Sequence, residues 1–324
     1  MKNKPSKILM VQPINFGFNG ETAATNLFQK NDSKLTPAEI QKAALEEFKA
    51  FVKLLKANGI ETMVVKDTSN PITPDSIFPN NIVSFHLIKS ITVPLPGKED
   101  ELNNTMTFED SKAMVLYSMM ALNRRIERKG FLDKMKDECN LVLDYSVNEK
   151  NNFFLEGTGS IVFDYEQEIA YAAVSPRTKI QLLEMLCKQL GYSYIAFNAV
   201  DKSGIKIYHT NVMLAIGKGF AVVCEKSIKN KEELFTVMKS LIDTDHEIIT
   251  IDYKQLNAFA GNIYQLFNNK GKSLIVMSEK AFKSLKKAQL NKLSKFGKVI
   301  HTPLYTIEKY GGGSARCMIA DIRY

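Results

Sequence analysis

The feature of this chain that most constrains its fold is a segment pattern that recurs along its length. Two short apolar strands about a turn, then a helix, then a third strand are predicted in three successive copies, with helices at TKIQLLEMLCKQLG, EELFTVMKSLI and AFKSLKKAQLNKLSKFG. A unit of this size cannot bury its own apolar face, so the copies must pack against one another. The pattern therefore predicts an α/β fold in which the units form a closed radial array.

Another copy precedes these three, and the last segment of the chain begins one more. In the earlier copy, FPNNIVSFHLIKSITVPL predicts two strands about a turn, followed by a long helix from Met114 to Cys139 and the strand NLVLDYS. Gly311–Tyr324 supplies a single strand of the last copy. The N-terminal strand KILMVQP, a helix and the strand ETMVVK would complete it if the chain closes on itself. We therefore expect residues 1–324 to form a single domain.

The helix near the N-terminus has clear start and stop signals. Thr36 is suited to cap it, Pro37 fits the first turn, and Glu39 completes a capping box with Thr36. We expect the helix to stop at Asn58-Gly59, because the glycine can take the left-handed conformation that ends many helices.

Each unit begins with a polar residue at an equivalent place. These residues are Asn81, Glu156, His209, Asn262 and Cys317, at spacings of 75, 53, 53 and 55 residues, the first of which includes an insertion. In a ring of such units the five positions converge on the axis. A cysteine nucleophile needs a thiolate, a partner that manages protons and a third group that orients this partner. We expect Cys317, His209 and Glu156 to fill these roles in that order.

Residue types alone leave ordinary structural roles open for the same three side chains. A strand cysteine such as Cys317 is more often a core residue than a catalyst. His209 would then be a hydrogen-bonded core histidine, and Glu156 would pair with a basic neighbour.

Composition and spacing argue against several other classes of protein. No apolar run is long enough to span a bilayer, and the N-terminus lacks the apolar region of a secretory signal, so we expect a cytoplasmic protein without a membrane partner. The four cysteines and four histidines lack CxxC and HxxxH spacing, which favours a reduced compartment with neither a metal nor a cofactor. Lysine-rich helical stretches carry much of the net charge of +8 and indicate a solvated helix face, so no nucleic-acid partner is expected.

Several motifs resemble those of the arginine deiminase and amidinotransferase superfamily, the five-bladed penteins: PDSIFPNN, LEGTGS, YHTNVMLAIG and GGGSARC. The resemblance covers nearly the whole chain. Three further stretches are similar to the citrulline utilization hydrolases: VQPINFGFN, PNNIVSFH and YSMMALNRRIERK. The chain also resembles the dimethylarginine dimethylaminohydrolases. The resemblance implies a five-bladed α/β propeller that forms one catalytic domain. Its central Cys–His–Glu site would attack the planar carbon of a guanidine or urea and form a covalent thio-intermediate, which water hydrolyses.

Asn81 departs from the pattern of the guanidine-using members of the superfamily. The dimethylarginine hydrolases have an acidic residue at this position, and a carboxylate suits a delocalised cation. An amide offers both an acceptor and donors, which suits a neutral ureido group. We therefore expect hydrolysis of L-citrulline to ornithine, carbon dioxide and ammonia. The alternative is that Asn80 and Asn81 only form a turn.

The resemblance also implies a set of substrate-binding residues, which comprises Phe16, Asn19, Asp75, Asn80, Asn81, Arg125 and Arg177. Asp75 would hold the substrate amine or anchor its own loop. Arg177 matches an arginine that holds the substrate α-carboxylate in the dimethylarginine hydrolases, and otherwise is a surface residue at a helix start. Arg124 and Arg125 would do the same or pair with carboxylates. The loop from Asn15 to Asn19 would line or cover the site, or simply form a turn.

Other functions remain open from the sequence. A guanidine-directed deiminase, a dimethylarginine hydrolase and an amidinotransferase share this chemistry, and the transferase passes the intermediate to an amine. A non-catalytic pentein binding module would not need the Cys–His–Glu set, and a papain-type peptidase has its cysteine before its histidine, the reverse of this chain. The expected partner is a small amino-acid substrate, and the sequence does not decide between a monomer and a homo-oligomer.

Overall fold

The fold is built from three-stranded units of one topology. The computed structural model describes residues 3–32, 34–68, 70–94, 105–128, 134–135 and 138–324. In each unit the second strand runs antiparallel to the first and parallel to the third. Three units form separate sheets: β6 (Ile161–Asp164), β7 (Ile169–Ala173) and β8 (Ser193–Phe197); β9 (Leu214–Gly217), β10 (Phe220–Val223) and β11 (Glu247–Thr250); β12 (Tyr264–Phe267), β13 (Ser273–Ser278) and β14 (Lys298–Thr302).

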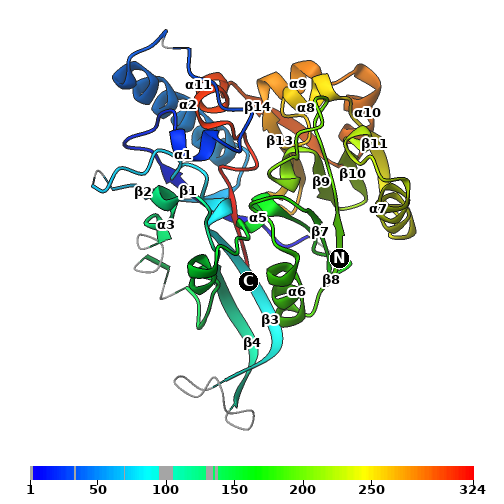
Figure 1. Ribbon diagram of the computed structural model, residues 1–324. Coiled ribbons are helices and arrows are strands. Elements are labelled where there is room, and N and C mark those ends of the chain that lie inside the picture. The colour runs from blue at the N-terminus through cyan, green and yellow to red at the C-terminus, as the bar shows by residue number, and fades with distance from the viewer. Residues whose placement is uncertain (1–2, 33, 69, 95–104, 129–133, 136–137) are drawn as a thin grey trace.

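The other two units share one six-stranded sheet in the order β2-β1-β15-β3-β4-β5. The strands are β1 (Lys7–Gln12), β2 (Glu61–Lys66), β3 (Val83–Pro94), β4 (Thr105–Leu116), β5 (Leu141–Asp144) and β15 (Ala320–Arg323). Strand β15 pairs with β1 on one side and with β3 on the other. The two ends of the chain therefore complete one unit together, as the sequence predicts, and the α/β class is confirmed (Figure 1).

The unit that contains β3 and β4 differs from the prediction. FPNNIVSFHLIKSITVPL does not form two strands about a turn, because Val83–Pro94 is one continuous strand paired with β4. The predicted helix from Met114 to Cys139 is wrong at its start, since β4 continues to Leu116 and helix α3 begins at Leu122 and ends at Arg125. Residues 129–133 and 136–137 of the predicted helix lie outside the described residues. The apolar run around Met114 fits both a helical and an extended period, and long-range pairing with β3 decides between them.

The longer helices flank the sheets on the outside of the molecule, whereas the short helix α5 lies near its centre (Figure 1). Their bounds are α1 (Gly20–Ala23), α2 (Pro37–Ala57), α5 (Gly157–Ser160), α6 (Ile180–Leu190), α7 (Lys231–Asp243), α8 (Tyr253–Asn257), α9 (Glu279–Ser284), α10 (Lys287–Phe296) and α11 (Tyr305–Gly311), with 3₁₀ turns η1 (Pro79–Asn81), η2 (Ser146–Asn151), η3 (Thr210–Val212) and η4 (Glu225–Ser227). Among the described residues, no helix has the length and apolarity needed to cross a bilayer.

Two helix predictions have different outcomes. The capping box of α2 is present, because the Thr36 hydroxyl accepts from the backbone N–H of Glu39 and the Glu39 carboxylate accepts from that of Thr36. Gly59 has a φ of +83°, as expected for the residue after the helix. The helix predicted over AFKSLKKAQLNKLSKFG is instead split into α9 and α10, because Leu285 and Lys286 are extended.

Short turns at the start of three units bring the polar positions together. Asn81 ends η1, Glu156 directly precedes α5, and His209 directly precedes η3. Helix α5 contacts both η1 and η3. The three turns therefore meet at the centre of the molecule, where sequence spacing places a site.

Candidate active site

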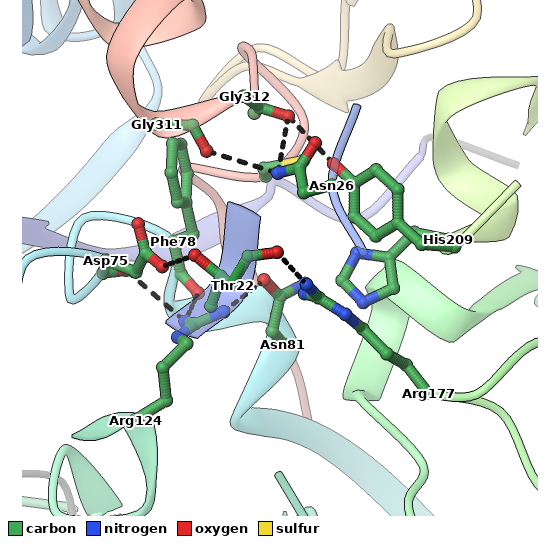
Figure 2. A pocket seen from close by; sticks show the side chains of 13 residues that line it. Thr22, Asn26, Asp75, Phe78, Asn81, Arg124, Arg177, His209, Gly311 and Gly312 are labelled. Carbon is green, nitrogen blue, oxygen red and sulfur yellow. Dashed lines mark hydrogen bonds between the residues drawn. The ribbon is translucent and has the colours of Figure 1, made fainter. Parts of the chain in front are cut away.

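A small cavity lies where these turns meet. Its lining consists of Thr22, Asn26, Asp75, Phe78, Asn81, Arg124, Arg177, Tyr208, His209, Gly311, Gly312, Gly313 and Cys317 (Figure 2). Its volume is about 10 Å³, which is roughly the space of one water molecule. An amino-acid substrate therefore cannot enter until some of the lining residues move.

Cys317 reaches this cavity from a turn that follows the glycine run. The backbone N–H of Cys317 donates to the carbonyl of Ser314 at 3.0 Å, and the side chain is buried. A Cβ at Gly311 or Gly313 would lie 2.7 or 2.8 Å from the ring of Phe78, so only glycine permits this approach. The glycines thus let the backbone that precedes Cys317 pack against Phe78, which lines the cavity.

His209 and Glu156 meet directly, as their register predicts. Nε2 of His209 lies 2.8 Å from Oε2 of Glu156, and both side chains are buried. A carboxylate can only accept, so Nε2 carries the hydrogen and Nδ1 of the neutral ring remains an acceptor. Burial lowers the pKa of His209 to about 4, although the hydrogen bond and charge of Glu156 act to raise it. At neutral pH His209 is therefore a free base.

Glu156 is held by donors on both of its oxygens. Arg177 approaches Oε2 at 3.3 Å, and the backbone N–H of Met120 donates to Oε1 at 3.1 Å. Burial acts to raise the pKa of Glu156, but the charge of Arg177 and then the hydrogen bond from His209 lower it to about 2. The carboxylate consequently stays ionised and fixes the orientation of the imidazole.

Arg177 also connects the site to the segment around α1. Its Nη2 donates to the carbonyl of Thr22 at 2.7 Å (Figure 2). Its Nε donates to the hydroxyl of Thr25 at 2.9 Å. The guanidinium lies over the ring of Tyr208, at 4.9 Å from the ring centroid. In this closed arrangement Arg177 binds Glu156 and the Thr22–Thr25 segment, so its predicted contact with a substrate carboxylate requires these bonds to rearrange.

Asp75 and Asn19 form the other attachment of this segment. Oδ2 of Asp75 accepts from Nδ2 of Asn19 and from the hydroxyl of Thr22, each at 2.8 Å, while Oδ1 has no partner among the described residues. Burial raises the pKa of Asp75. Asp75 thus anchors its surroundings and also lines the cavity, so both predicted roles remain compatible with its place.

Phe16 and Asn80 do not line the cavity. Phe16 is buried, and its backbone N–H donates to Oε1 of Gln41 at 2.6 Å. Asn80 is turned towards α5, where its Nδ2 donates to the hydroxyl of Thr158 at 3.2 Å. In this arrangement both residues support the walls of the site from behind.

Asn81 lines the cavity and is held from one side by Arg124. Nη1 of Arg124 donates to Oδ1 of Asn81 at 2.8 Å, whereas Nδ2 of Asn81 is buried and has no partner in the described part of the chain. Nε and Nη2 of Arg124 both donate to the carboxylate of Glu127, at 3.1 Å each. The ion pair with Glu127 holds the Arg124 guanidinium in place, and the guanidinium in turn fixes the orientation of the Asn81 amide.

Arg124, and not Arg125, is the arginine of α3 that lines the cavity. Successive helix residues point about 100° apart, so only one of the two can face inward. Nε of Arg125 instead donates to the carbonyl of Met119 at 2.9 Å, and its guanidinium lies 5.7 Å from the ring centroid of Phe154. The sequence allowed either arginine, because the phase of a short helix depends on where it begins.

Several residues around the thiol and the cavity were not among the predicted site residues. Asn262 and Asn211 donate to Sγ of Cys317 at 3.2 and 3.5 Å. The register marked the position of Asn262, but it gave no role to it. Thr22, Asn26 and Tyr208 line the cavity without any signal in the sequence beyond their neighbourhood to Asn19 and His209.

A family model and several solved structures match this chain. The model of N,N-dimethylarginine dimethylhydrolase of the eukaryotic type matches residues 12–324. The apo structure of ArgZ, an arginine dihydrolase from the ornithine-ammonia cycle in cyanobacteria, is 18% identical with a TM-score of 0.72, over 98% of this chain and 40% of that chain. This chain therefore spans well under half the length of that protein.

Two further structures are similar over almost their full length. The N-terminal domain of an ArgZ variant, covalently bound to a reaction intermediate, is 18% identical with a TM-score of 0.72, over 98% of this chain and 97% of that chain. A dimethylarginine dimethylaminohydrolase adduct with 4-chloro-2-hydroxymethylpyridine is 14% identical with a TM-score of 0.62, over 98% and 100%. At these identities the structures show a shared fold. No curated protein sequence matches the chain.

Proposed function

The chain belongs to the eukaryotic N,N-dimethylarginine dimethylhydrolase family of penteins, and on that premise we propose that it is a cysteine-dependent hydrolase that converts L-citrulline to ornithine, carbon dioxide and ammonia. In this proposal residues 1–324 form one catalytic domain, and the five three-stranded units are the blades of a propeller around the site. The observation that carries the choice of citrulline is the orientation of the Asn81 amide.

Arg124 determines which end of the Asn81 amide faces the substrate. A guanidinium can only donate, so it must face Oδ1, and Nδ2 is left as a free donor. The oxygen of a ureido group accepts a hydrogen bond from such a donor, whereas a guanidinium has no acceptor. A buried donor left unpaired costs about 1–3 kcal/mol, which corresponds to a preference for the ureido group of roughly tenfold or more.

The proposed reaction uses Cys317 as nucleophile and His209 as proton carrier. His209 Nδ1 takes the thiol proton, Sγ adds to the ureido carbon, and the bond from that carbon to the δ-nitrogen breaks as the proton passes to the nitrogen. Ornithine leaves, and an S-carbamoyl group remains on Cys317. His209 then takes a proton from water, the resulting hydroxide displaces the sulfur, and the proton returns to the thiolate. The released carbamate breaks down to carbon dioxide and ammonia.

Three other residues support this chemistry without changing covalently. Glu156 holds His209 in the tautomer whose Nδ1 is free. The free donor of Asn81 stabilises the charge that develops on the ureido oxygen, as in an oxyanion hole. Arg177 keeps Glu156 ionised, and in the open enzyme it would bind the substrate carboxylate through its guanidinium fork.

The comparisons favour a second candidate, in which arginine is the first substrate. Similar structures include an arginine dihydrolase, and two successive hydrolyses at one cysteine would convert arginine first to citrulline and then to ornithine. The second hydrolysis is the reaction proposed here.

A substrate panel tests the proposal against its competitors. Citrulline, arginine, dimethylarginine and agmatine are supplied singly, and ornithine, citrulline and ammonia are measured. Release of ornithine from citrulline is expected. If citrulline is inert while arginine or dimethylarginine yields citrulline, the enzyme is a guanidine hydrolase and the proposal is wrong. Adding an amine acceptor identifies an amidinotransferase by its transfer product.

Asn81→Asp is expected to move the preference from the ureido towards the guanidino group. One aspartate oxygen would still accept from Arg124, and the other would place an acceptor where the amide had a donor. We expect kcat/KM for citrulline to fall by about 10–100-fold, and the ratio of arginine to citrulline turnover to rise. Product analysis under single-substrate conditions measures both.

Asn80→Asp is the matched control, because it adds the same charge one residue away on a side chain turned towards Thr158. The ratio of the two turnover rates is the quantity to compare, since loss of folded enzyme lowers both rates equally. An unchanged ratio in the Asn81 variant would contradict the role given to its amide.

Gly159→Ala is expected to separate Asn81 from His209. A Cβ at this position would lie 2.4 Å from Nδ2 of Asn81 and 2.7 Å from Nδ1 of His209, so both side chains would have to shift. Displacement of catalytic groups by about 1 Å can cost about 100-fold, and we expect a loss of this size in kcat/KM for citrulline. Circular dichroism and thermal unfolding show whether the fold survives; a folded variant with full activity would show that this contact is not needed.

A further inference from the structure

Asn262 lies beside the sulfur of Cys317, and the reaction proposed above gives it no task. Its side chain is fully buried, and Nδ2 is 3.2 Å from Sγ. It follows the turn that ends at Gly261 and lies two residues before the start of β12 at Tyr264.

Two backbone groups fix the orientation of the Asn262 amide. The N–H of Arg316 donates to Oδ1 at 3.1 Å, and Nδ2 donates to the carbonyl of Asn211 at 3.0 Å. A backbone N–H can only donate and a carbonyl can only accept, so the oxygen and the nitrogen of the amide cannot exchange places. One N–H of Nδ2 serves Asn211, and the other is left for Sγ.

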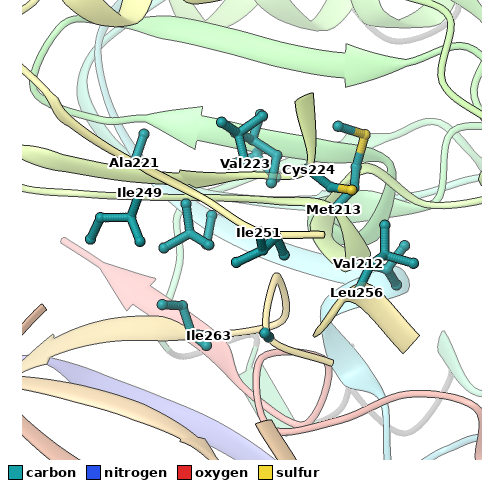
Figure 3. Packing of buried hydrophobic residues seen from close by; sticks show 14 of the residues in the cluster. Val212, Met213, Ala221, Val223, Cys224, Ile249, Ile251, Leu256 and Ile263 are labelled. Atoms are coloured by element: carbon teal, nitrogen blue, oxygen red, sulfur yellow. The ribbon is translucent and has the colours of Figure 1, made fainter. Parts of the chain in front are cut away.

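The backbone around these two asparagines is anchored in the apolar core. Val212 and Ile263, the residues after Asn211 and Asn262, are buried in one cluster (Figure 3). A Cβ at Gly261 would lie 2.4 Å from the carbonyl oxygen of Val212, so glycine is required for this close approach. The position of the Asn262 donor is thus set by packing on both sides of it.

A second amide faces the sulfur less closely. Asn211 lies near Sγ with Nδ2 at 3.5 Å and Oδ1 at 4.0 Å. Its oxygen is placed to accept from the thiol, and its nitrogen to donate to the thiolate. Of the two asparagines, Asn262 is the one that presents only a donor.

The nearby cations are engaged elsewhere in the resting site. The guanidinium of Arg316 donates to the carbonyl of Ile319 at 2.6 Å and lies 4.0 Å from the ring centroid of Tyr264. Burial lowers the pKa of His209 to about 4, so this residue, which lines the cavity with Cys317, is not an imidazolium at neutral pH. A thiolate accepts a hydrogen bond far more strongly than a thiol does. Donation from an amide therefore favours the thiolate without adding a charge to the cavity.

We propose that Asn262 is a further catalytic residue, whose amide donates to Cys317 Sγ and stabilises the thiolate that attacks the substrate. This inference rests on the proposed function for the role of Cys317 as nucleophile, but it is independent of which ureido or guanidino compound is the substrate. A neutral donor also suits a neutral substrate. A cationic donor would add a charge to the cavity, and this charge would lose its hydration when the substrate binds.

The test compares Asn262→Asp with Asn262→Ala in the full chain without substrate. Alkylation of Cys317 by iodoacetamide is followed as a function of pH, with each cysteine resolved by peptide mass spectrometry. At neutral pH we expect both variants to react at least about tenfold more slowly than the parent. At alkaline pH we expect all three rates to converge, because a thiol then ionises without a hydrogen-bond donor. The aspartate keeps the shape of the side chain but replaces its donor with an acceptor, so it should not rescue the rate.

A merely structural role gives a different result. In that case the aspartate would restore the parent profile, or both variants would be slower by one factor at every pH, and either outcome overturns the inference. Should the aspartate variant fail to fold, the pH profile of the alanine variant decides alone. Asn198→Ala is the matched control, because its exposed amide bonds only to Glu233 among the described residues, and its profile should equal that of the parent.

Alkylation requires no substrate, so this test and the substrate panel fail independently. If the pH profile of alkylation shifts in the Asn262 variants but no ureido or guanidino compound is turned over, the proposed function is wrong and the role of Asn262 towards the thiolate still holds. If citrulline is turned over but the pH profile of alkylation does not shift in the Asn262 variants, the proposed function holds and the inference about Asn262 is wrong.

Discussion

Cys317→Ala is expected to abolish citrulline turnover, with a fall in kcat of at least about 10⁴-fold. Loss of a nucleophile in covalent hydrolases leaves only the rate enhancement of binding and polarisation. Here the alanine would remove the sulfur that faces the cavity lined by His209 and Asn81. Neither of those side chains can form the S-carbamoyl intermediate in its place. Ornithine release from citrulline measures the loss.

Cys224→Ala is the matched control for this substitution. Cys224 is also fully buried, but it packs in the apolar core beside Val223 and Met213 and not in the cavity. Burial raises the pKa of its thiol, which makes it a poor nucleophile. The control should cost stability but leave kcat within about twofold. If Cys317→Ala keeps activity within about tenfold of the parent, the nucleophile has been misassigned.

A mass measurement adds a second, independent check on the same residue. Rapid acid quenching of the parent enzyme during citrulline turnover should trap a carbamoyl group on the peptide that contains Cys317, as expected for a two-step covalent reaction. The alanine variant should show no such adduct. An active enzyme that never carries an adduct would indicate direct attack by water.

The register of the repeats predicts the contacts of the site better than it predicts the elements around them. Residues 53 positions apart meet as Glu156 and His209, and residues 55 positions apart meet as Asn262 and Cys317. A repeat favours such contacts because the turns at the start of successive units pack together, as α5 does with η1 and η3. The start of α2 could also be predicted from the sequence, because the two residues of its capping box, Thr36 and Glu39, are local neighbours.

The structure of the unit that contains β3 and β4, and the contacts of the arginines, could not be predicted because they depend on residues far apart in the sequence. The helix predicted from Met114 onward overlaps the end of strand β4, because the pairing of this strand with β3 is not visible in a local window. Arg177 binds Thr22 and Thr25, which lie about one hundred and fifty residues earlier in the chain, so no local pattern could reveal the contact. Such bonds join segments that only the complete fold brings together, and they also decide which arginines face the cavity.

Glu156→Gln is expected to lower kcat by about 10³–10⁴-fold, the range seen when an amide replaces the buried carboxylate that orients a catalytic histidine in other hydrolases. Three donors converge on the two oxygens of Glu156: Nε2–H of His209, the Arg177 guanidinium and the N–H of Met120. Glutamine has one oxygen, so its amide nitrogen must face at least one donor. If it faces His209, the ring must move its hydrogen to Nδ1, and the proposed base is lost.

The matched control is Glu149→Gln, because Glu149 also accepts from a backbone N–H and an arginine but lies outside the cavity lining. Oε1 of Glu149 bonds to the N–H of Met119 at 2.7 Å and to Nη1 of Arg128 at 2.6 Å. This control should destabilise the protein while leaving kcat nearly unchanged. Glu156→Asp should fall between the parent and the glutamine variant, since it keeps the charge but shortens the reach to the ring.

The effect of Glu156→Gln on stability has its own pH dependence, which separates it from the effect on the reaction. The folded pKa of Glu156, about 2, lies below its ordinary value of 4.5, so the ionised carboxylate stabilises the fold above about pH 4.5. That contribution disappears as the pH falls through about 2, and the glutamine variant lacks it throughout. We therefore expect the difference in melting temperature between parent and variant to narrow in acid, whereas the loss of kcat should persist at every pH where the enzyme is folded. A glutamine variant that is as stable as the parent at neutral pH and within about tenfold of its rate would show that the carboxylate neither orients His209 nor pairs with Arg177.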